Sequence, residues 1–351
     1  MAASSEPPRP GRGSPCPAHG RANCDRYTPA MTGRDRGLRL GVDLGGTKIE
    51  IVALDQAGCE LLRRRVPAPR DDYDRTVAAV ADLVAGAEAE LGRRGTVGIG
   101  TPGALSPATG LLRNSNSVWL NGRPFRRDLE VALGREIRMS NDANCFALSE
   151  AIDGAARGAG LVFGVIVGTG TGAGVVVRGQ VLTGVNAIAG EWGHNPLPWP
   201  RPEELPGPAC YCGKRGCLET FLSGPGLSRD HEGATGRRLP PQAIVAAAEA
   251  GEAAAEASLL RYEDRMARGL AHVINVLDPE VIVLGGGISN LARLYENVPR
   301  SWGRYVFSDT VATALSRPRF GDSSGVRGAA WLWNEDIGAE RAGYPGVRKG
   351  R

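Results

Sequence analysis

The sequence predicts an α/β protein in which a domain-sized unit occurs twice. Residues 38–54 and 161–177 each have the pattern of two short apolar strands around a turn rich in glycine and threonine. The two hairpins start about 125 residues apart, and this spacing indicates an internal duplication. Apolar residues at helical spacing within 76–91, and helices expected at about 241–277, supply the α component.

The two predicted units suggest a domain organisation. A small N-terminal lobe is expected at 38–140 and a larger lobe at 141–324, with a final helix at 325–337 completing the small lobe. Residues 1–37 are rich in proline, arginine, glycine and serine and have no periodic apolar pattern. Such a segment buries too little apolar surface to offset its chain entropy, so we expect a disordered tail.

Composition and charge exclude several classes of protein. The chain has 351 residues, 42% of them hydrophobic, and a net charge of +4, as is ordinary for globular proteins. Arginine-rich stretches at 9–39 and 63–70 supply most of this modest charge, which argues against a nucleic-acid partner. No run approaches the ~18 apolar residues of a membrane span, and the N-terminus lacks an apolar signal core. We therefore expect a cytoplasmic protein without a membrane partner.

The first glycine turn has the features of a site for a phosphate group. At Gly45 and Gly46 backbone N–H groups can approach an anion closely, and Thr47 adds a hydroxyl donor. Asp43, beside the turn, is placed to hold Mg²⁺ through water, and Lys48 follows the turn. The segment is not a Walker A loop, because the order and spacing differ and a strand follows. For this turn alone, an ordinary tight hairpin is the alternative.

Two further glycine turns favour a nucleotide site. They are Gly168-Thr169-Gly170, in the second hairpin, and Gly285-Gly286, after an apolar run at 281–284. Three such turns, each at the end of a strand, are what a cleft would need to hold a nucleotide from both sides. We therefore expect a nucleotide between the two halves.

Asn141 and Asp142 lie between a strand predicted at 136–139 and a helix predicted to run to about residue 154. Two interpretations of Asp142 are open. In one, it caps this helix. In the other, it is a carboxylate at the base of a cleft, where it accepts the proton of an attacking hydroxyl group. Phosphoryl transfer needs little more from protein side chains than positioning and charge neutralisation.

The strongest local signal is a set of metal-binding residue types at close spacing: His194, Cys210, Cys212 and Cys217. One imidazole and three thiolates match a closed tetrahedral Zn²⁺ site, and a site with four protein ligands is structural rather than catalytic. The alternative is a group of reduced structural thiols. An odd total of seven cysteines, three of them clustered, argues against a disulfide framework.

Two carboxylates flank the zinc pattern. Glu191 lies three residues before His194, and Glu219 lies two residues after Cys217. Zinc would hold both side chains in place, where they are good acceptors for sugar hydroxyl groups. The alternative for each is a solvated surface charge. Another histidine, His231, follows a loop and is expected to be exposed.

Five motifs, in this order along the chain, resemble those of the ROK family of bacterial sugar kinases. They are Leu-Gly-Val-Asp-Leu-Gly-Gly-Thr-Lys at 40–48, Asn-Asp-Ala-Asn at 141–144, Gly-Thr-Gly at 168–170, Gly-Glu-Trp-Gly-His at 190–194 and the cysteine cluster. The resemblance extends from residue 39 to residue 334. It implies a duplicated ribonuclease-H-like fold of the actin-like ATPase type, with two lobes around a central cleft. It also implies ATP and Mg²⁺ as cofactors and, as often in the family, a homodimer.

The resemblance implies roles for individual residues as well. By position, Asp142 matches the catalytic base, and the loops at 41–48 and 168–175 match those that bind the phosphates of ATP. The residues that match zinc ligands are His194, Cys210, Cys212 and Cys217. The residues assigned to the sugar are Gly103, Asn141, Asp142, Glu191, His194 and Glu219.

Within the family, four segments look closest to bacterial fructokinase, also called manno(fructo)kinase: 69–73, 114–122, 190–199 and 321–333. We therefore expect transfer of the γ-phosphoryl group of ATP to O6 of a hexose, D-fructose above all and also mannose. Glucokinase and N-acetylhexosamine kinase are the alternatives, since N-acetylglucosamine kinases of the family share 141–149. A sugar-sensing transcriptional repressor would carry an N-terminal helix-turn-helix, for which 1–37 is too short and too rich in proline.

Overall fold

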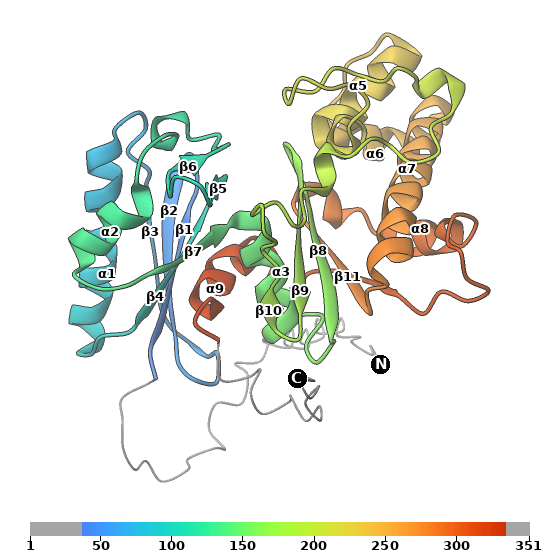
Figure 1. Ribbon diagram of the computed structural model, residues 1–351. Coiled ribbons are helices and arrows are strands. Elements are labelled where there is room, and N and C mark those ends of the chain that lie inside the picture. Colours follow the sequence, from blue (N-terminus) through green and yellow to red (C-terminus); the bar gives the residue numbers. More distant parts are fainter. Residues whose placement is uncertain (1–36, 335–351) are drawn as a thin grey trace, which may run out of the picture. The chain divides into compact units, whose positions relative to one another are not determined.

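The computed structural model describes residues 37–334. The tail expected at 1–37, apart from Gly37, and the end of the helix expected at 325–337 therefore lie outside the described part. Within it, the chain forms two five-stranded mixed sheets, one in each half (Figure 1). This arrangement confirms the predicted α/β fold.

The N-terminal sheet consists of an antiparallel meander to which two parallel strands are added. Its strands lie in the order β3 (Glu60–Pro67), β2 (Lys48–Leu54), β1 (Arg39–Leu44), β4 (Thr96–Thr101) and β7 (Arg138–Asn141). β2 pairs antiparallel with β1 and β3, whereas β4 runs parallel to β1 and β7 runs parallel to β4. A small hairpin of β5 (Ala104–Leu105) and β6 (Leu112–Arg113) follows β4.

The C-terminal sheet repeats this arrangement. Its strands lie in the order β10 (Gln180–Val181), β9 (Thr171–Val177), β8 (Leu161–Val167), β11 (Val281–Gly285) and β12 (Ala314–Ser316). Again the first three strands along the chain form an antiparallel meander, and the next two are added in parallel. The common order confirms the predicted duplication, because the β1–β2 and β8–β9 hairpins hold equivalent places.

Helices cover the sheets and form three hydrophobic clusters with them: an N-terminal core, a C-terminal core and a third cluster. The N-terminal core includes α1 (Tyr73–Leu91) and α2 (Phe125–Leu133), and the C-terminal core includes α4 (Leu218–Leu222), α5 (Gly224–Thr235), α6 (Pro241–Glu249), α7 (Ala253–Leu277) and α8 (Leu294–Trp302). The third cluster lies around the remaining helices, α3 (Asp142–Ile152) and α9 (Ser324–Trp331). Short 3₁₀ turns are η1 (Val118–Leu120), η2 (Trp192–His194), η3 (Pro202–Glu204), η4 (Gly287–Asn290) and η5 (Gly321–Ser323). None of the helices within residues 37–334 is long and apolar enough to cross a membrane.

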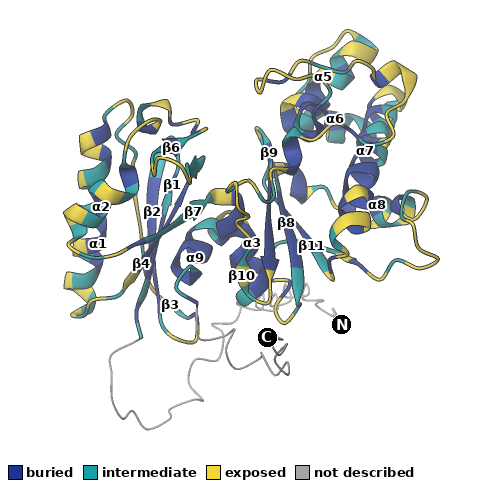
Figure 2. Ribbon diagram, in the orientation of Figure 1, coloured by how far each residue is buried: buried dark blue, intermediate teal, exposed yellow. Residues whose placement is uncertain are grey.

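α3 and α9 pack against each other where the two halves meet. α9 lies on β1 and β4, whereas α3 lies on β8 and β9, and both helices are largely buried (Figure 2). The backbones approach too closely for a side chain at two glycines. A Cβ at Gly41 would lie 2.1 Å from the Val326 carbonyl oxygen, and one at Gly328 would lie 1.6 Å from that of Cys145. The lobe boundaries at residues 140 and 324 stay predictions.

Candidate active site

Asp142 is the first residue of α3, directly after β7. The cap of this helix is Asn141, whose side-chain oxygen accepts the backbone N–H of Asn144 at 2.8 Å. The interpretation of Asp142 as the helix cap is therefore wrong. Asp142 is exposed, and its Oδ1 atom accepts the N–H of its neighbour Ala143 at 2.8 Å. The carboxylate is thus accessible to a substrate.

The surroundings of Asp142 suit a general base. Protein packs around most of the carboxyl group although solvent reaches it, and this burial raises the pKa of Asp142. The hydrogen bond from Ala143 lowers the pKa, and the negative charge of Glu191 raises it again. A carboxylate whose pKa is raised binds a proton more strongly, so it is a better acceptor for the proton of a hydroxyl group.

Asp43 lies near the end of β1, opposite Glu50 on β2. Burial raises the pKa of Asp43 to about 6, and the charges of Asp142 and Glu50 add to this rise. The positive charges of Lys48 and Arg65 oppose it. The two aspartates therefore lie close enough to affect each other, as expected for the ends of β1 and β7 in one sheet, where Asp43 pairs with Gly100 and Gly100 with Ser140. Neighbouring carboxylates suit a hard divalent cation such as Mg²⁺.

The second and third glycine turns meet beside one cavity. Gly286 has a φ of +79°, and a Cβ there would lie 2.4 Å from the Val167 carbonyl oxygen, so glycine is required. The N–H of Gly224 donates to the Gly168 carbonyl at 2.8 Å and closes the same region. The cavity measures about 620 Å³, and its lining includes Gly168, Thr169, Ser228, Arg238, Gln242 and Gly287. Backbone amides beside a concave, partly apolar wall suit a nucleotide.

The first glycine turn, at 45–47, lies on the N-terminal sheet. The N–H of Gly45 donates to the Lys48 carbonyl at 2.9 Å and closes the hairpin, and Thr47 is exposed. No hydrogen bond between described residues joins this turn to the turn at 168–170. Its connection to the rest of the site runs through Asp43, which precedes it and interacts with Asp142.

Glu191 and Glu219 both lie beside β9. A carboxylate oxygen of Glu219 accepts the N–H of Thr171 at 2.9 Å, so this side chain lies at the first residue of the strand. A Cβ at Gly193 would lie 2.0 Å from the Thr171 carbonyl oxygen, which shows how closely the segment after Glu191 follows β9. The electrostatic effect of Glu191 on Asp142 places these two carboxylates near each other.

Gly103 lies two residues beyond the last pair of β4 and β7, in which Thr101 faces Asn141. It has a φ of +79°, and a Cβ there would lie 2.3 Å from a backbone carbonyl of β6, so glycine is required. Gly103 therefore lies near the start of α3. In the loop that follows β6, the Asn121 side chain bonds both the N–H and the carbonyl of Ser115, each at 2.9 Å, and fixes the loop's shape.

His194 and the three cysteines converge, as the sequence predicts. One ligand atom from each of the four side chains lies within 4.8 Å of the others. His194 Nδ1 lies 3.5 Å from Cys210 Sγ, and Cys212 Sγ lies 3.6 Å from Cys217 Sγ. Four ligands at ordinary zinc distances and tetrahedral angles would be separated by about 3.5–3.8 Å. The donor set and its spacing therefore fit a four-coordinate zinc ion.

The two roles expected of His194 compete for its ring. Its Nδ1 atom faces the thiols, whereas its Nε2 atom lies 2.8 Å from the hydroxyl group of Tyr211. Only Nε2 is therefore left for a sugar, and Tyr211 already contacts it. Tyr211 is 82% exposed, and no sequence pattern pointed to it.

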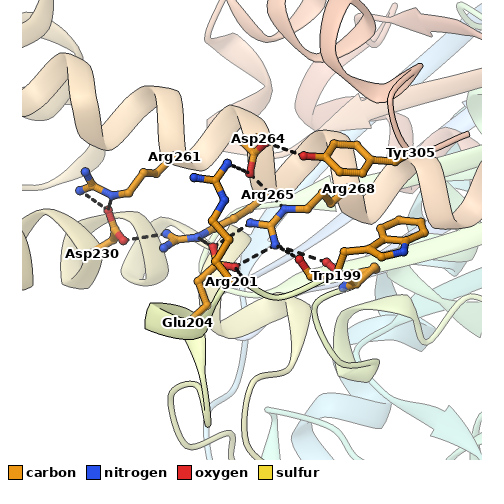
Figure 3. A network of polar contacts seen from close by, with 10 residues as sticks. Trp199, Arg201, Glu204, Asp230, Arg261, Asp264, Arg265, Arg268 and Tyr305 are labelled. Atoms are coloured by element: carbon orange, nitrogen blue, oxygen red, sulfur yellow. Dashed lines mark hydrogen bonds and ion pairs between the residues drawn. The ribbon is translucent and has the colours of Figure 1, made fainter.

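A buried network of charged residues anchors the loop that carries the zinc ligands (Figure 3). The Glu204 carboxylate, 4% exposed, accepts hydrogen bonds from Arg265 and Arg268 of α7 at 2.7 to 2.8 Å. Arg265 also donates to Asp230 of α5 at 2.7 Å. The loop is thus fixed to α7 directly, and to α5 through Arg265, by contacts that involve no metal. Sequence reasoning missed this network, because it joins residues more than sixty positions apart.

Comparison with known proteins identifies the family. Residues 39–336 match the family model described as the ROK family. The chain belongs to the ROK family. The matched range agrees with the range over which the motifs resemble that family, so the prediction of a ROK-family sugar kinase is confirmed at that level.

Three relatives show what this ROK protein is similar to. An N-acetyl-D-glucosamine kinase of Photobacterium profundum is 40% identical over 299 residues, which cover 84% of this chain and 99% of that protein. A ROK hexokinase from Thermus thermophilus has a TM-score of 0.76 at 37% identity and covers 84% of this chain and 97% of its own. A ROK family glucokinase from Streptomyces griseus, solved with glucose and AMPPNP, has a TM-score of 0.66 at 28% identity, with 84% and 99% covered.

The narrower prediction of a fructokinase finds no support in these relatives. None of the three is named a fructokinase, and their names agree better with the alternatives, glucokinase and N-acetylhexosamine kinase. The comparisons therefore support a sugar kinase of the ROK family and do not favour fructose as its substrate.

Proposed function

We propose that the protein transfers the γ-phosphoryl group of ATP to the primary hydroxyl group, O6, of a hexose. The observation that carries this proposal is the position of Asp142. It is an accessible carboxylate at the start of α3, and it interacts with Asp43 of one sheet and with Glu191 beside the other. A general base must reach the proton that it removes, and this place between the halves allows it.

In the proposed reaction, the Asp142 carboxylate accepts the proton of the sugar hydroxyl group as the hydroxyl oxygen attacks the γ-phosphorus. A bond forms between that oxygen and the γ-phosphorus, and the bond from the γ-phosphorus to the β–γ bridging oxygen breaks. The products are the hexose 6-phosphate and ADP. The residues proposed to orient the sugar are Gly103, Asn141, Glu191, His194 and Glu219. Closure of the lobes would exclude water that otherwise hydrolyses ATP.

We place the nucleotide in the cavity of about 620 Å³ beside Gly168 and Gly287. The backbone donors proposed for its phosphates are Gly45, Gly46, Thr47, Lys48, Gly168, Thr169, Gly170, Gly285 and Gly286. The glucokinase from Streptomyces griseus was solved with AMPPNP, which supports ATP as the donor. Mg²⁺ supplies charge neutralisation when bound to the phosphates, and Asp43 is the residue proposed to hold it.

We assign a structural Zn²⁺ to His194, Cys210, Cys212 and Cys217. The fit of the four ligand atoms supports this assignment. Because all four ligands come from the protein, the ion has no position left for a substrate. We propose that the ion fixes the segment of the chain that runs from Glu191 to Glu219. These two residues supply the carboxylates that face the sugar.

The identity of the hexose depends on the sugar subsite. The names of these relatives favour N-acetyl-D-glucosamine or glucose, and N-acetyl-D-glucosamine is the first candidate. Fructose is the second, because segments 114–122 and 190–199 resemble those of fructokinases and lie near Gly103 and Asp142. A subsite without partners for an N-acetyl group would leave its amide unpaired, at a cost of about 1–3 kcal/mol, roughly one to two orders of magnitude in selectivity.

A coupled kinase assay over fructose, mannose, glucose, N-acetylglucosamine and N-acetylmannosamine tests both levels of the proposal. Activity on any of them supports the kinase assignment, and the order of kcat/KM identifies the substrate. N-acetylglucosamine in first place supports the first candidate, and fructose or mannose in first place supports the second. Absence of activity on all five sugars, with zinc and Mg²⁺ supplied, would contradict the proposed function.

A further inference from the structure

The chain passes between the two sheets twice (Figure 1). It leaves β7 of the N-terminal sheet and enters α3, and it leaves β12 of the C-terminal sheet to reach α9, which packs on the N-terminal sheet. Any change in the angle between the lobes must be absorbed at these two crossings. They lie side by side, because α3 and α9 pack against each other.

Glu150 joins the two crossings. It lies on α3, and its side chain is 0% exposed. Its Oε1 atom accepts the hydroxyl group of Ser324 at 2.6 Å. Its Oε2 atom accepts the N–H of Arg319 at 3.0 Å and that of Ala155 at 2.8 Å. Ser324 begins α9 and Arg319 lies on the segment that leads to it, so one carboxylate ties α3 to the second crossing.

The surroundings of the Glu150 carboxylate do not favour the stability of the folded protein. Its hydrogen-bond donors are one hydroxyl group and two backbone amides, and no ion pair between described residues includes it. Burial of a carboxylate without a cationic partner costs free energy. The backbone beside Glu150 leaves room for the carboxylate because residue 154 is a glycine. A Cβ at Gly154 would lie 2.3 Å from Glu150 Oε2. These features favour a role in positioning over a role in stability.

The network continues from α9 to Asp43. Ser323, the residue before α9, accepts a hydrogen bond from Arg63 Nη1 at 2.8 Å. The same nitrogen donates to Glu50 at 2.6 Å, and Glu50 faces Asp43 across the β1–β2 pair. A continuous set of contacts therefore leads from the helix that begins at Asp142 to the strand that carries Asp43.

We propose that Glu150 is a positioning residue that holds the lobes at the angle at which Asp43 and Asp142, at strand ends of the N-terminal sheet, face the cavity beside Gly168 on the C-terminal sheet. This inference rests on the proposed kinase function. Glu150 touches no substrate and acts through α3 and α9. Without its bond to Ser324 the two crossings move more independently, so the two aspartates face the nucleotide cavity of the C-terminal half in fewer molecules. The rate of phosphoryl transfer falls, whereas sugar binding is retained because the residues assigned to the sugar are unchanged.

The test compares three variants of the full chain with wild type. Ser324→Ala removes the hydroxyl group that Glu150 accepts. Ser149→Ala is the matched control: Ser149 precedes Glu150 on α3, is also 0% exposed, and its hydroxyl group has no hydrogen-bond partner within the described residues. Glu150→Gln tests whether a neutral side chain of the same shape can replace the carboxylate. Glutamine keeps an oxygen for the backbone amides, and its NH₂ group can donate to Ser324.

Ser324→Ala is expected to lower kcat roughly tenfold, the effect of one lost buried hydrogen bond, with the KM for the sugar within about twofold of wild type. Ser149→Ala is expected to match wild type, and Glu150→Gln to keep about a third of kcat or more. Urea unfolding confirms that each variant is folded. An active wild type combined with an unchanged kcat in Ser324→Ala, or an equal loss in Ser149→Ala, would overturn the proposal.

A second measurement separates this proposal from the kinase function. A wild type that phosphorylates no hexose contradicts the proposed function, and small-angle X-ray scattering with and without AMPPNP still reports the angle between the lobes. We expect the radius of gyration of Ser324→Ala to differ from that of wild type in at least one of the two states. Identical values in both states would contradict the positioning role of Glu150.

Discussion

Replacing Asp43 with asparagine is expected to make the protein more stable and less active at neutral pH. Burial, together with the charges of Asp142 and Glu50, raises the pKa of Asp43 from its ordinary value of 3.8 to about 6. At pH 7.5 the folded protein therefore carries a charge that its surroundings disfavour. A shift of about two pKa units corresponds to about 3 kcal/mol as an upper limit, and solvent screening reduces the expected gain to about 1–3 kcal/mol.

The sign of the effect predicts its dependence on pH. Because the folded-state pKa is raised, the cost is present in full above about pH 6 and decreases as the pH falls. Near pH 5 about half of it remains, and below about pH 4 the carboxyl group is mostly protonated in both the folded and the unfolded state. The advantage of Asp43→Asn should therefore shrink on acidification.

Urea unfolding in magnesium-free buffer at several pH values measures this effect. Asp309→Asn is a suitable control, since Asp309 is exposed and its replacement should change the free energy of unfolding by less than about 0.5 kcal/mol. Activity of Asp43→Asn is measured in parallel and should be strongly reduced. A variant that is less stable than wild type at pH 7.5, or a gain that does not shrink on acidification, would refute the reasoning.

Three further predictions concern the base, the metal and the packing of α9. Asp142→Asn should keep the fold and sugar binding but lower kcat by roughly two to four orders of magnitude, and near-normal turnover would rule it out as the base. Elemental analysis should find about one zinc per chain, and chelation should lower both the melting temperature and the activity; carefully purified protein without zinc would disprove the site. Gly328→Ala should destabilise the protein by about 3 kcal/mol or more in urea unfolding, because its Cβ would lie 1.6 Å from the Cys145 carbonyl oxygen. Gly233→Ala, where a Cβ meets nothing within 4 Å, should not, and equal losses in both would contradict the packing argument.

Features that depend on residue type and local spacing were predictable from the sequence. The glycine turns at 45–47 and 168–170 mark hairpins because glycine and the β-rich runs around it are local signals. The convergence of His194 with the three cysteines followed from residue types that bind one metal. The repeat of the two sheets followed from the recurrence of one hairpin pattern.

Features that depend on contacts distant in sequence were not predictable. Asn141 and Asp142 are both good capping residues, and only the backbone geometry decides that Asn141 is the cap. His231 was expected to be exposed but is 0% exposed and lies 3.1 Å from the hydroxyl group of Ser258. It lies on α5, whose apolar pattern is weak, so the packing of this helix on α7 could not be inferred. Pairing of Glu204 with Arg268 likewise needs the fold to bring the two together.

The place of α9 on β1 and β4 has a consequence for synthesis of the chain. The N-terminal sheet leaves the ribosome first, but the helix that covers one of its faces is translated nearly two hundred residues after β7. Until then, α9 is not present to cover Gly41, whose backbone it contacts in the folded protein. The C-terminal sheet, by contrast, receives α3 to α8 as it emerges. The first half of the molecule to be translated is thus the last to be completed.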